Sequence, residues 1–250
     1  MGSTSGWAVV RPRADRVITA IHQPNFFPWL GYFDKLARCD KFVVLDTAQL
    51  QKKGGSWVNR VKLAVAGEGK WVTAAIDRNY EGVRAINEIR FDEPQLWRTK
   101  FLKTLKASYA KRPFFGETMT LVAPLLDEEC EFLVGFNHQA IVCIAQAIGL
   151  DTSKIVLASE VQGSGAGTEL LIDLTRRAGG TAYLCGGGAQ GYQDDQAFED
   201  AGLELIYQDF THPDYPQSNN TSAFIPGLSI IDALMNVGVD GTRALLSRAG

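Results

Sequence analysis

The sequence predicts an α/β fold of three layers, in which helices cover both faces of a mostly parallel sheet. Short apolar runs typical of strands alternate with helical patterns at both ends of the chain. The chain has 250 residues, of which 46% are hydrophobic, and a net charge of −3. This length can bury the large core that such a sheet requires. We therefore expect one α/β domain with a β/helical insertion in its middle part.

The first predicted unit is a strand, a loop, a helix and a second strand. Its segments are a β-branched run at 17–21, a loop with two prolines at 22–28, helical spacing at 30–39 and the strand KFVVLD at 41–46. This βαβ order predicts two parallel strands, as in Rossmann-like sheets. Ligands of open parallel sheets bind at the carboxyl ends of the strands. Those ends are the loop that begins at His22 and the segment after Asp46.

The insertion covers about residues 50–130. Its predicted strands are 57–63, 71–76 and 86–91, and its predicted helices are one from Asp92, the expected N-cap, to Pro113 and another over 118–126. An almost wholly apolar helix is expected at 132–148. Strand and helix then alternate again, with strands at 154–159, 182–185 and 203–207 and helices at 168–178, 194–201 and 229–237. We expect residues 1–16 to form a flexible leader and 17–250 to form the single domain.

Composition excludes several classes of protein. No apolar run approaches the ~20 residues of a membrane helix, and the arginine-rich N-terminus does not match a secretory signal, so we expect a cytoplasmic protein without membrane insertion. The four cysteines lack disulfide or zinc-finger spacing, and no metal-ligand motif is present, so no metal is expected. The small negative net charge does not favour nucleic acid as the default partner.

The most unusual segment is the loop His22-Gln-Pro-Asn25-Phe-Phe-Pro-Trp29. A rigid ligand loop is one interpretation, with His22 as an acid/base or phosphate donor and Asn25 as an orienting amide. In the alternative the aromatic side chains plug the edge of the sheet and the imidazole bonds backbone carbonyls.

A second candidate segment follows the strand that ends at Asp46. We expect this carboxylate to act in catalysis, and the substrate-binding candidates after it are Lys53, Trp57, Asn59 and Arg60. Lysine in a glycine-hinged loop and a bidentate arginine are suited to a phosphate or a carboxylate. A solvated basic hairpin is the alternative.

A third candidate segment lies near the C-terminus. It holds the catalytic candidate His212 and the substrate-binding candidates Tyr215, Gln217 and Asp232. Ser229, Asp232 and Asn236 fall near one helical face. A capping box, with Ser229 as N-cap and Asp232 as its partner, explains the first two of these without a function.

Together, the motifs resemble the WbqC-like family of bacterial proteins. The segments that carry the resemblance are HQPNFFPWLGYFDKLARCDKFVVLDTAQLQKKGGSWVNRVKL, YLCGGGAQGY, HPDYPQ and FIPGLSIIDALMNVG, and they span about residues 18–238. The resemblance implies a role in the modification of sugars or amino sugars for surface glycans or natural products. The opening unit is also similar to nucleotidyltransferase-like folds, although it lacks their two histidines.

We therefore expect a transferase that modifies an amino-sugar or nucleotide-linked small-molecule intermediate by acyl or aminoacyl transfer. A nucleotide or an activated acyl or aminoacyl donor, including aminoacyl-tRNA, is its expected co-substrate. The alternatives are an ATP-dependent activating or ligating enzyme and a non-catalytic binding or scaffold protein that uses its five tryptophans as a partner surface. The transferase hypothesis requires residues 22–60 and 209–236 to meet in one cleft.

Overall fold

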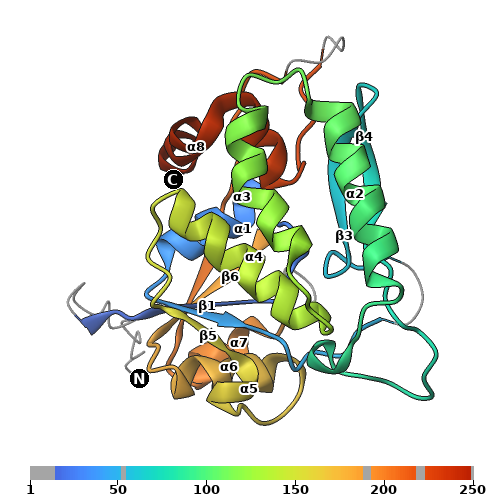
Figure 1. Cartoon of the computed structure of the whole chain (residues 1–250). Helices are drawn as coiled ribbons and strands as arrows, with labels where there is room; N and C mark the ends of the chain where they lie inside the picture. The colour runs from blue at the N-terminus through green and yellow to red at the C-terminus, as the bar shows by residue number, and fades with distance from the viewer. Residues whose placement is uncertain (1–14, 52–54, 188–192, 218–222, 249–250) are drawn as a thin grey trace, which may run out of the picture.

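A five-stranded parallel sheet forms the centre of the protein. The computed structural model describes residues 15–51, 55–187, 193–217 and 223–248. The strands are β1 (Ile18–His22), β2 (Lys41–Val44), β5 (Ile155–Leu157), β6 (Ala182–Gly186) and β7 (Glu204–Gln208). Their order is β5-β2-β1-β6-β7, and every neighbouring pair is parallel. The α/β fold with helices on both sides of a mostly parallel sheet is therefore confirmed (Figure 1).

Both faces of the sheet are buried, which explains why its strands are continuous apolar runs rather than alternating ones. Ala20, Phe42 and Leu184 belong to the larger of two apolar cores. Their neighbours in sequence, Ile21 and Val43, belong to the smaller core on the opposite face. Successive side chains of a strand alternate between faces, so β1 contributes to both cores.

The larger core lies between the sheet and α1 (Leu30–Arg38), α3 (Phe115–Asp127), α4 (Leu133–Ala147) and α8 (Ile230–Arg248). Leu30, Phe33 and Leu36 place the apolar stripe of α1 on this core. The predicted helix at 229–237 corresponds to the first part of α8. Gly238, with a φ of 71°, then kinks the chain before a second helical segment that the sequence analysis did not predict.

The smaller core is covered by α5 (Ala158–Val161), α6 (Gly167–Arg177) and α7 (Asp195–Asp200). Figure 1 shows these helices below the sheet, opposite α1, α4 and α8. Phe198 of α7 stacks on Tyr183 of β6 at 5.1 Å between ring centroids. The Asp194 side chain accepts a hydrogen bond from the Ala197 backbone and so caps α7.

The insertion contains an antiparallel hairpin and one long helix. Its elements are β3 (Arg60–Val65), β4 (Glu68–Thr73), the short 3₁₀ helix η2 (Ile86–Glu88) and α2 (Pro94–Tyr109). The predicted strand at 57–63 was placed too early, because residues 57–59 form a turn. The predicted strand at 86–91 was wrong for its first half, which is η2. Glu93 rather than Asp92 is the residue that precedes α2, and it makes no capping hydrogen bond through its side chain.

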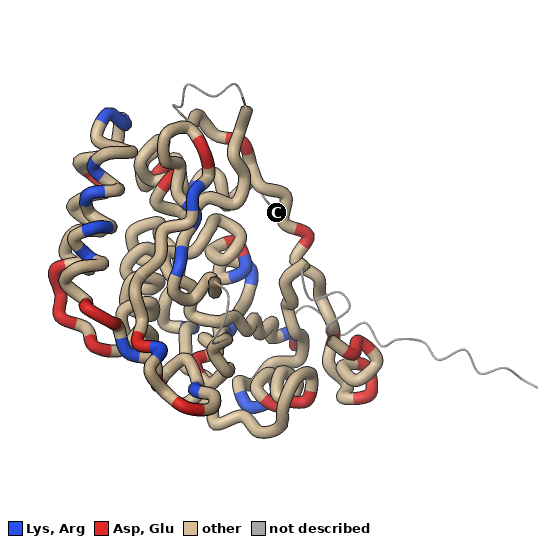
Figure 2. Tube along the Cα trace, turned by 90° about the vertical axis from the view of Figure 1, so that its right-hand side faces the viewer, with Lys and Arg blue, Asp and Glu red and all other residues tan. Residues whose placement is uncertain are grey.

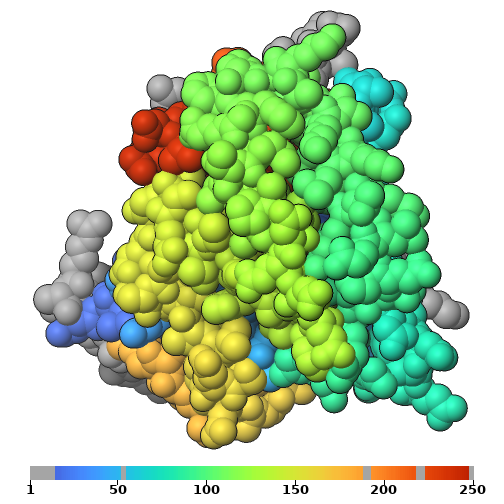
Figure 3. Space-filling view, in the orientation of Figure 1, coloured from blue at the N-terminus to red at the C-terminus, as the bar shows by residue number. Residues whose placement is uncertain are grey.

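Helices α2, α3 and α4 form one continuous outer surface (Figure 3). Basic residues recur along α2, whose apolar side chains Trp97, Phe101 and Leu105 are buried in the larger core (Figure 2). Among the described residues, no helix has both the length and the apolar content needed to cross a bilayer.

Candidate functional site

A cavity of about 480 Å³ opens at the carboxyl ends of β1 and β6. The chain leaves β1 into α1 on one face of the sheet and leaves β6 toward α7 on the other face. Such a reversal is the topological switch point at which open α/β sheets bind their ligands. The lining residues are Ile21, His22, Gln23, Trp29, Gly31, Lys35, Leu45, Leu171, Tyr183, Gly186, Gly187, Gln208 and Phe210.

Lys35 of α1 supplies the positive charge of this cavity, and its side chain is only 2% exposed. Its Nζ donates to the Ile21 carbonyl at 3.0 Å and lies 5.9 Å from the centre of the Tyr183 ring. It forms no ion pair with any described residue. Burial lowers the pKa of Lys35 from 10.5 to about 8. The ammonium group is thus held at the site without a carboxylate to neutralise it.

His22 lies beside Lys35 at the end of β1, as the sequence analysis placed it. Its Nδ1 is 3.1 Å from the Gln23 carbonyl oxygen. A carbonyl can only accept, so Nδ1 carries the proton and Nε2 keeps its lone pair. Burial and, secondarily, the Lys35 charge lower the pKa of His22 to about 3. The imidazole is therefore neutral in the ligand-free protein.

Gly186 and Gly187 line the same cavity with backbone that carries no side chain. A Cβ built on Gly186 would meet no atom within 4 Å, and one on Gly187 would meet only the Gln208 carbonyl at 3.7 Å. Backbone without side chains lets a phosphate approach closely. The rest of this glycine-rich loop, 188–192, lies outside the described residues.

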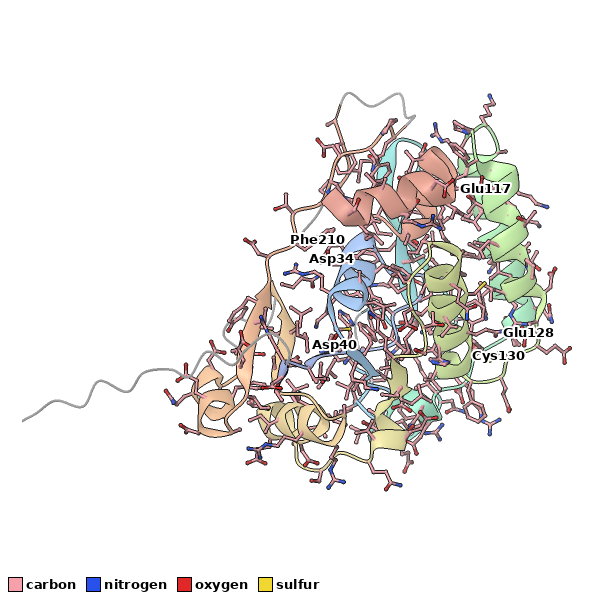
Figure 4. The ribbon with its side chains drawn as sticks, turned by 90° about the vertical axis from the view of Figure 1, so that its left-hand side faces the viewer. Asp34, Asp40, Glu117, Glu128, Cys130 and Phe210 are labelled. Atoms are coloured by element: carbon pink, nitrogen blue, oxygen red, sulfur yellow. The ribbon has the colours of Figure 1, made fainter. Side chains whose placement is uncertain are left out.

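Gln208 of β7 also lines the cavity, and its side chain is hydrogen-bonded to α1. Its Nε2 donates to the Gly31 carbonyl and to Asp34 Oδ2, both at 2.7 Å. Asp34 also accepts from Arg38 at 3.5 Å. The carboxylate next to Lys35 in sequence is therefore already engaged. Asp34 and Phe210, a residue of the cavity wall, are labelled in Figure 4.

His212 lies next to the cavity without lining it. Its ring packs on Trp29, a lining residue, with 6.4 Å between ring centroids. Its Nδ1 lies 3.1 Å from the Pro213 carbonyl, and its buried Nε2 has no hydrogen-bond partner among the described residues. Burial lowers the pKa of His212. The contact does bring the N-terminal and C-terminal loops together, as the transferase hypothesis requires.

Asp46 does not line the first cavity. Its Oδ1 accepts from the Ser159 backbone at 2.9 Å and its Oδ2 from the Ser159 hydroxyl at 2.6 Å. Ser159 lies in the first turn of α5, where orphan N–H groups attract a carboxylate. The structure thus gives Asp46 a structural role at the start of α5.

The C-terminal candidates also hold the fold together. The Tyr215 hydroxyl donates to Asp232 Oδ2 at 2.7 Å inside the larger core, and burial raises the pKa of Asp232. Gln217 bonds the backbone of Ile225 through both ends of its amide. Ser229 Oγ accepts from Ile231 and donates to the Phe27 carbonyl. Asp232 bonds Tyr215 rather than completing a capping box.

Asn25 and Trp57 line a second cavity of about 360 Å³, together with His22, Trp29 and Gly227. Of the other candidates nearby, Asn59 donates to the Ala74 carbonyl at 3.1 Å, and the Arg60 guanidinium stacks 4.3 Å from the centre of the Trp71 ring. Lys53 lies outside the described residues.

The described tryptophans do not form one surface. Trp97 is 3% exposed within the larger core, whereas Trp57 and Trp71 are each 40% exposed. Trp7 lies outside the described residues. Among the described residues, Trp57 and Trp71 are the exposed tryptophans on which the partner-surface alternative rests.

Sequence reasoning missed Lys35, because a lysine in an amphipathic helix is normally solvent-exposed. One signal was available: Lys35 lies one helical turn after Gly31, and residues at this spacing share a face. Both residues line the first cavity.

Comparison with known proteins identifies the family of the chain. The chain is 28% identical over 223 residues to the uncharacterized protein Rv1507c of Mycobacterium tuberculosis (strain ATCC 25618 / H37Rv). The aligned region covers 88% of this chain and 94% of the relative. No solved structure matches the chain. The sequence model of the WbqC-like protein family matches residues 23–244. This range begins one residue after His22 and includes Lys35 and both glycines of the first cavity. The chain therefore belongs to the WbqC-like protein family.

Proposed function

We propose that the protein is a transferase that modifies an amino-sugar or nucleotide-linked intermediate by acyl or aminoacyl transfer in surface-glycan or natural-product biosynthesis. One observation carries the proposal. An uncompensated ammonium, a neutral imidazole and bare glycine backbone line one cavity at the switch point of a parallel sheet. The ammonium and the glycine backbone suit a phosphate, and the imidazole suits proton transfer.

Lys35 is the proposed anchor for the phosphate or other anionic group of the substrate. A buried cation without a partner gains more from an anion than a solvated one does, because water screens the charge less. The glycine backbone at Gly186 and Gly187, which carries no side chains, would let the anion approach closely. Leu171 and Phe210 would exclude water from the bound group.

His22 is the proposed base. In acyl transfer, the amine of the acceptor attacks the acyl carbonyl and a C–N bond forms, while the leaving group departs with the electron pair of its bond to the acyl carbon. The amine proton moves to His22 Nε2 and from there to the leaving group, which restores the neutral imidazole. The low pKa of the free imidazole makes it a poor base. An anion beside Lys35 would cancel one of the two causes of this low value, so substrate binding would raise the pKa of His22 and make it a better base.

The direct test is a transfer assay with a panel of nucleotide-linked amino sugars as acceptors and acyl-CoA thioesters or aminoacyl-tRNA as donors. Mass spectrometry would detect the added acyl group. We expect His22→Gln to abolish product formation and His138→Gln, a histidine of α4 outside both cavities, to leave it unchanged. Equal product from the wild type and His22→Gln would overturn the proposed role of His22.

The same panel separates transfer from ATP-dependent ligation. Release of pyrophosphate that requires both ATP and a carboxylic acid would favour a ligase and contradict simple transfer. A thermal-shift measurement with ATP supplements this assay, because a ligand that binds only the native state raises its stability.

A further inference from the structure

The second cavity shares two lining residues with the first. His22 and Trp29 line both cavities and therefore lie where the Lys35 cavity meets the cavity of Asn25 and Trp57. The indole of Trp29 can lie over α1 because Gly31 has no side chain: a Cβ at Gly31 would come within 2.3 Å of the ring. Among the described residues that line these cavities, the imidazole is the one titratable group that both share.

The two cavities differ in charge. The first contains Lys35, whereas the described residues that line the second are an imidazole, an amide, two indoles and a glycine, none of them charged. Its volume of about 360 Å³ is near the lower end of the ~300–1,000 Å³ range of ligand cavities, which suits a single ring-sized group. A neutral ligand that combines apolar and polar surface matches this lining.

Asn25 provides the polar contact. It is 4% exposed, and its side chain makes no hydrogen bond to another described residue. The amide atoms of Asn25 are not fully enclosed and keep access to the cavity, so a ligand can replace water as their hydrogen-bond partner. The loop that carries Asn25 is held on both sides, because Phe26 donates to the Trp57 carbonyl and Asn137 donates to the carbonyls of Pro24 and Val58. The amide is thus presented on a fixed backbone.

Trp57 provides an apolar face that is itself held in place. It is 40% exposed, and the ring of Trp71 packs against it in an edge-to-face arrangement at 4.7 Å. The face of an indole carries partial negative charge and attracts the weakly positive C–H hydrogens of a saturated ring. A pyranose has such a C–H face and a rim of hydroxyl groups, so an indole and an amide can bind it together.

We propose that the second cavity binds the pyranose ring of the substrate while the first cavity binds its phosphate. This inference rests on the proposed function and assigns each part of a phosphate-linked sugar to one cavity. The ring would contact Trp57 and hydrogen-bond Asn25, and the link between ring and phosphate would pass His22. The amine that receives the acyl group would then lie on the side of the ring next to the proposed base.

Calorimetric titration with two probes, inorganic phosphate and N-acetylglucosamine 1-phosphate, tests this division. We expect the wild type to bind the sugar phosphate about tenfold more tightly than phosphate, which corresponds to a gain of about 1.4 kcal/mol from the sugar ring. Trp57→Ala and Asn25→Ala should remove that difference and leave phosphate binding within about twofold. Lys35→Met should weaken the binding of both probes.

Two matched controls accompany these variants. Leu96→Ala removes an exposed apolar side chain of α2 that lines neither cavity, and Asn79→Ala removes an exposed asparagine amide. Both should retain the preference for the sugar phosphate. Asn25→Ser and urea denaturation of every variant separate loss of binding from loss of folding.

The outcomes distinguish the two proposals. Phosphate binding that depends on Lys35, with no gain from the sugar ring, would overturn the assignment of the second cavity and leave the anion site intact. A gain from the sugar that survives both Trp57→Ala and Asn25→Ala would also overturn the assignment. Binding of neither probe to the wild type would contradict the assignment and remove the anion site on which the proposed function depends.

Discussion

Replacement of Lys35 by methionine should make the ligand-free protein more stable. The side chain is 2% exposed and has no ion-pair partner among the described residues. Its pKa falls from 10.5 to about 8 on folding. Since a tenfold change in an ionisation constant corresponds to about 1.4 kcal/mol, the buried charge costs about 3 kcal/mol at neutral pH. Methionine has a similar length and fills the same space without this cost.

One hydrogen bond offsets part of the gain. Lys35→Met leaves the Ile21 carbonyl without its Nζ donor, a loss of about 1 kcal/mol. We therefore expect a net increase of about 2 kcal/mol in the free energy of unfolding. For a domain of this size, that increase corresponds to a rise of roughly 4–8 °C in the melting temperature.

The difference should also depend on pH. Between the two pKa values the unfolded chain holds a proton on Lys35 that the folded chain has lost, so the stability of the wild type rises as the pH increases from about 8 toward 10.5. The cost of the buried charge falls below about 1 kcal/mol by about pH 10. Lys35→Met lacks this titration, so its stability advantage should disappear over this range.

Urea denaturation followed by tryptophan fluorescence, repeated from pH 7 to about pH 10, measures this difference directly. Lys100→Met, on the exposed face of α2, is the matched control and should change stability by less than about 0.5 kcal/mol at every pH. A variant less stable than the wild type at neutral pH, or a stability difference that stays constant with pH, would refute the inferred state of Lys35.

Three further predictions concern the site and the contacts that position it. Tyr215→Phe removes the buried donor to Asp232 and should cost about 2 kcal/mol in urea denaturation, whereas Tyr207→Phe, which breaks an exposed Tyr–Asp hydrogen bond, should cost under about 1 kcal/mol; equal losses would contradict the burial argument. Asn137→Ala leaves the carbonyls of Pro24 and Val58 without donors and should cost about 3 kcal/mol, with Asn79→Ala as control; a loss below about 1 kcal/mol would mean that the loop does not depend on Asn137. Sulfate keeps its charge above neutral pH, so calorimetry should show its binding weaken about tenfold from pH 7 to pH 9 as Lys35 loses its proton; the same decline in Lys35→Met would exclude Lys35 as the cause.

The sequence was sufficient to predict the β1–α1–β2 unit, for a physical reason. Strands buried on both faces are unbroken apolar runs, and the helix between them must place Leu30, Phe33 and Leu36 on one face. The same argument located His22 at the carboxyl end of its strand, where the first cavity lies. Patterns set by nearby residues were therefore reliable.

Long-range partners could not be predicted in this way. Asp46 follows a strand as His22 does, but its carboxylate bonds Ser159, which lies 113 residues away in sequence. Tyr215 and Asp232 were separate candidates and are in fact partners of each other in the core. A sequence pattern identifies polar residues that need partners, but it cannot tell whether the partner is a distant residue or a ligand.

Lys35 and Asp34 illustrate how the fold makes that choice. Consecutive residues of a helix point about 100° apart, so these two side chains do not face each other and each needs its own partner. Gln208 and Arg38 engage the carboxylate of Asp34, so the Lys35 ammonium remains without a counter-charge. The fold accepts a cost in stability that methionine would avoid, and an anion bound in the first cavity would recover part of it. A neutral ligand would recover none of this cost, which is the physical reason to assign the charged part of the substrate to the Lys35 cavity and the neutral ring to the cavity beside it.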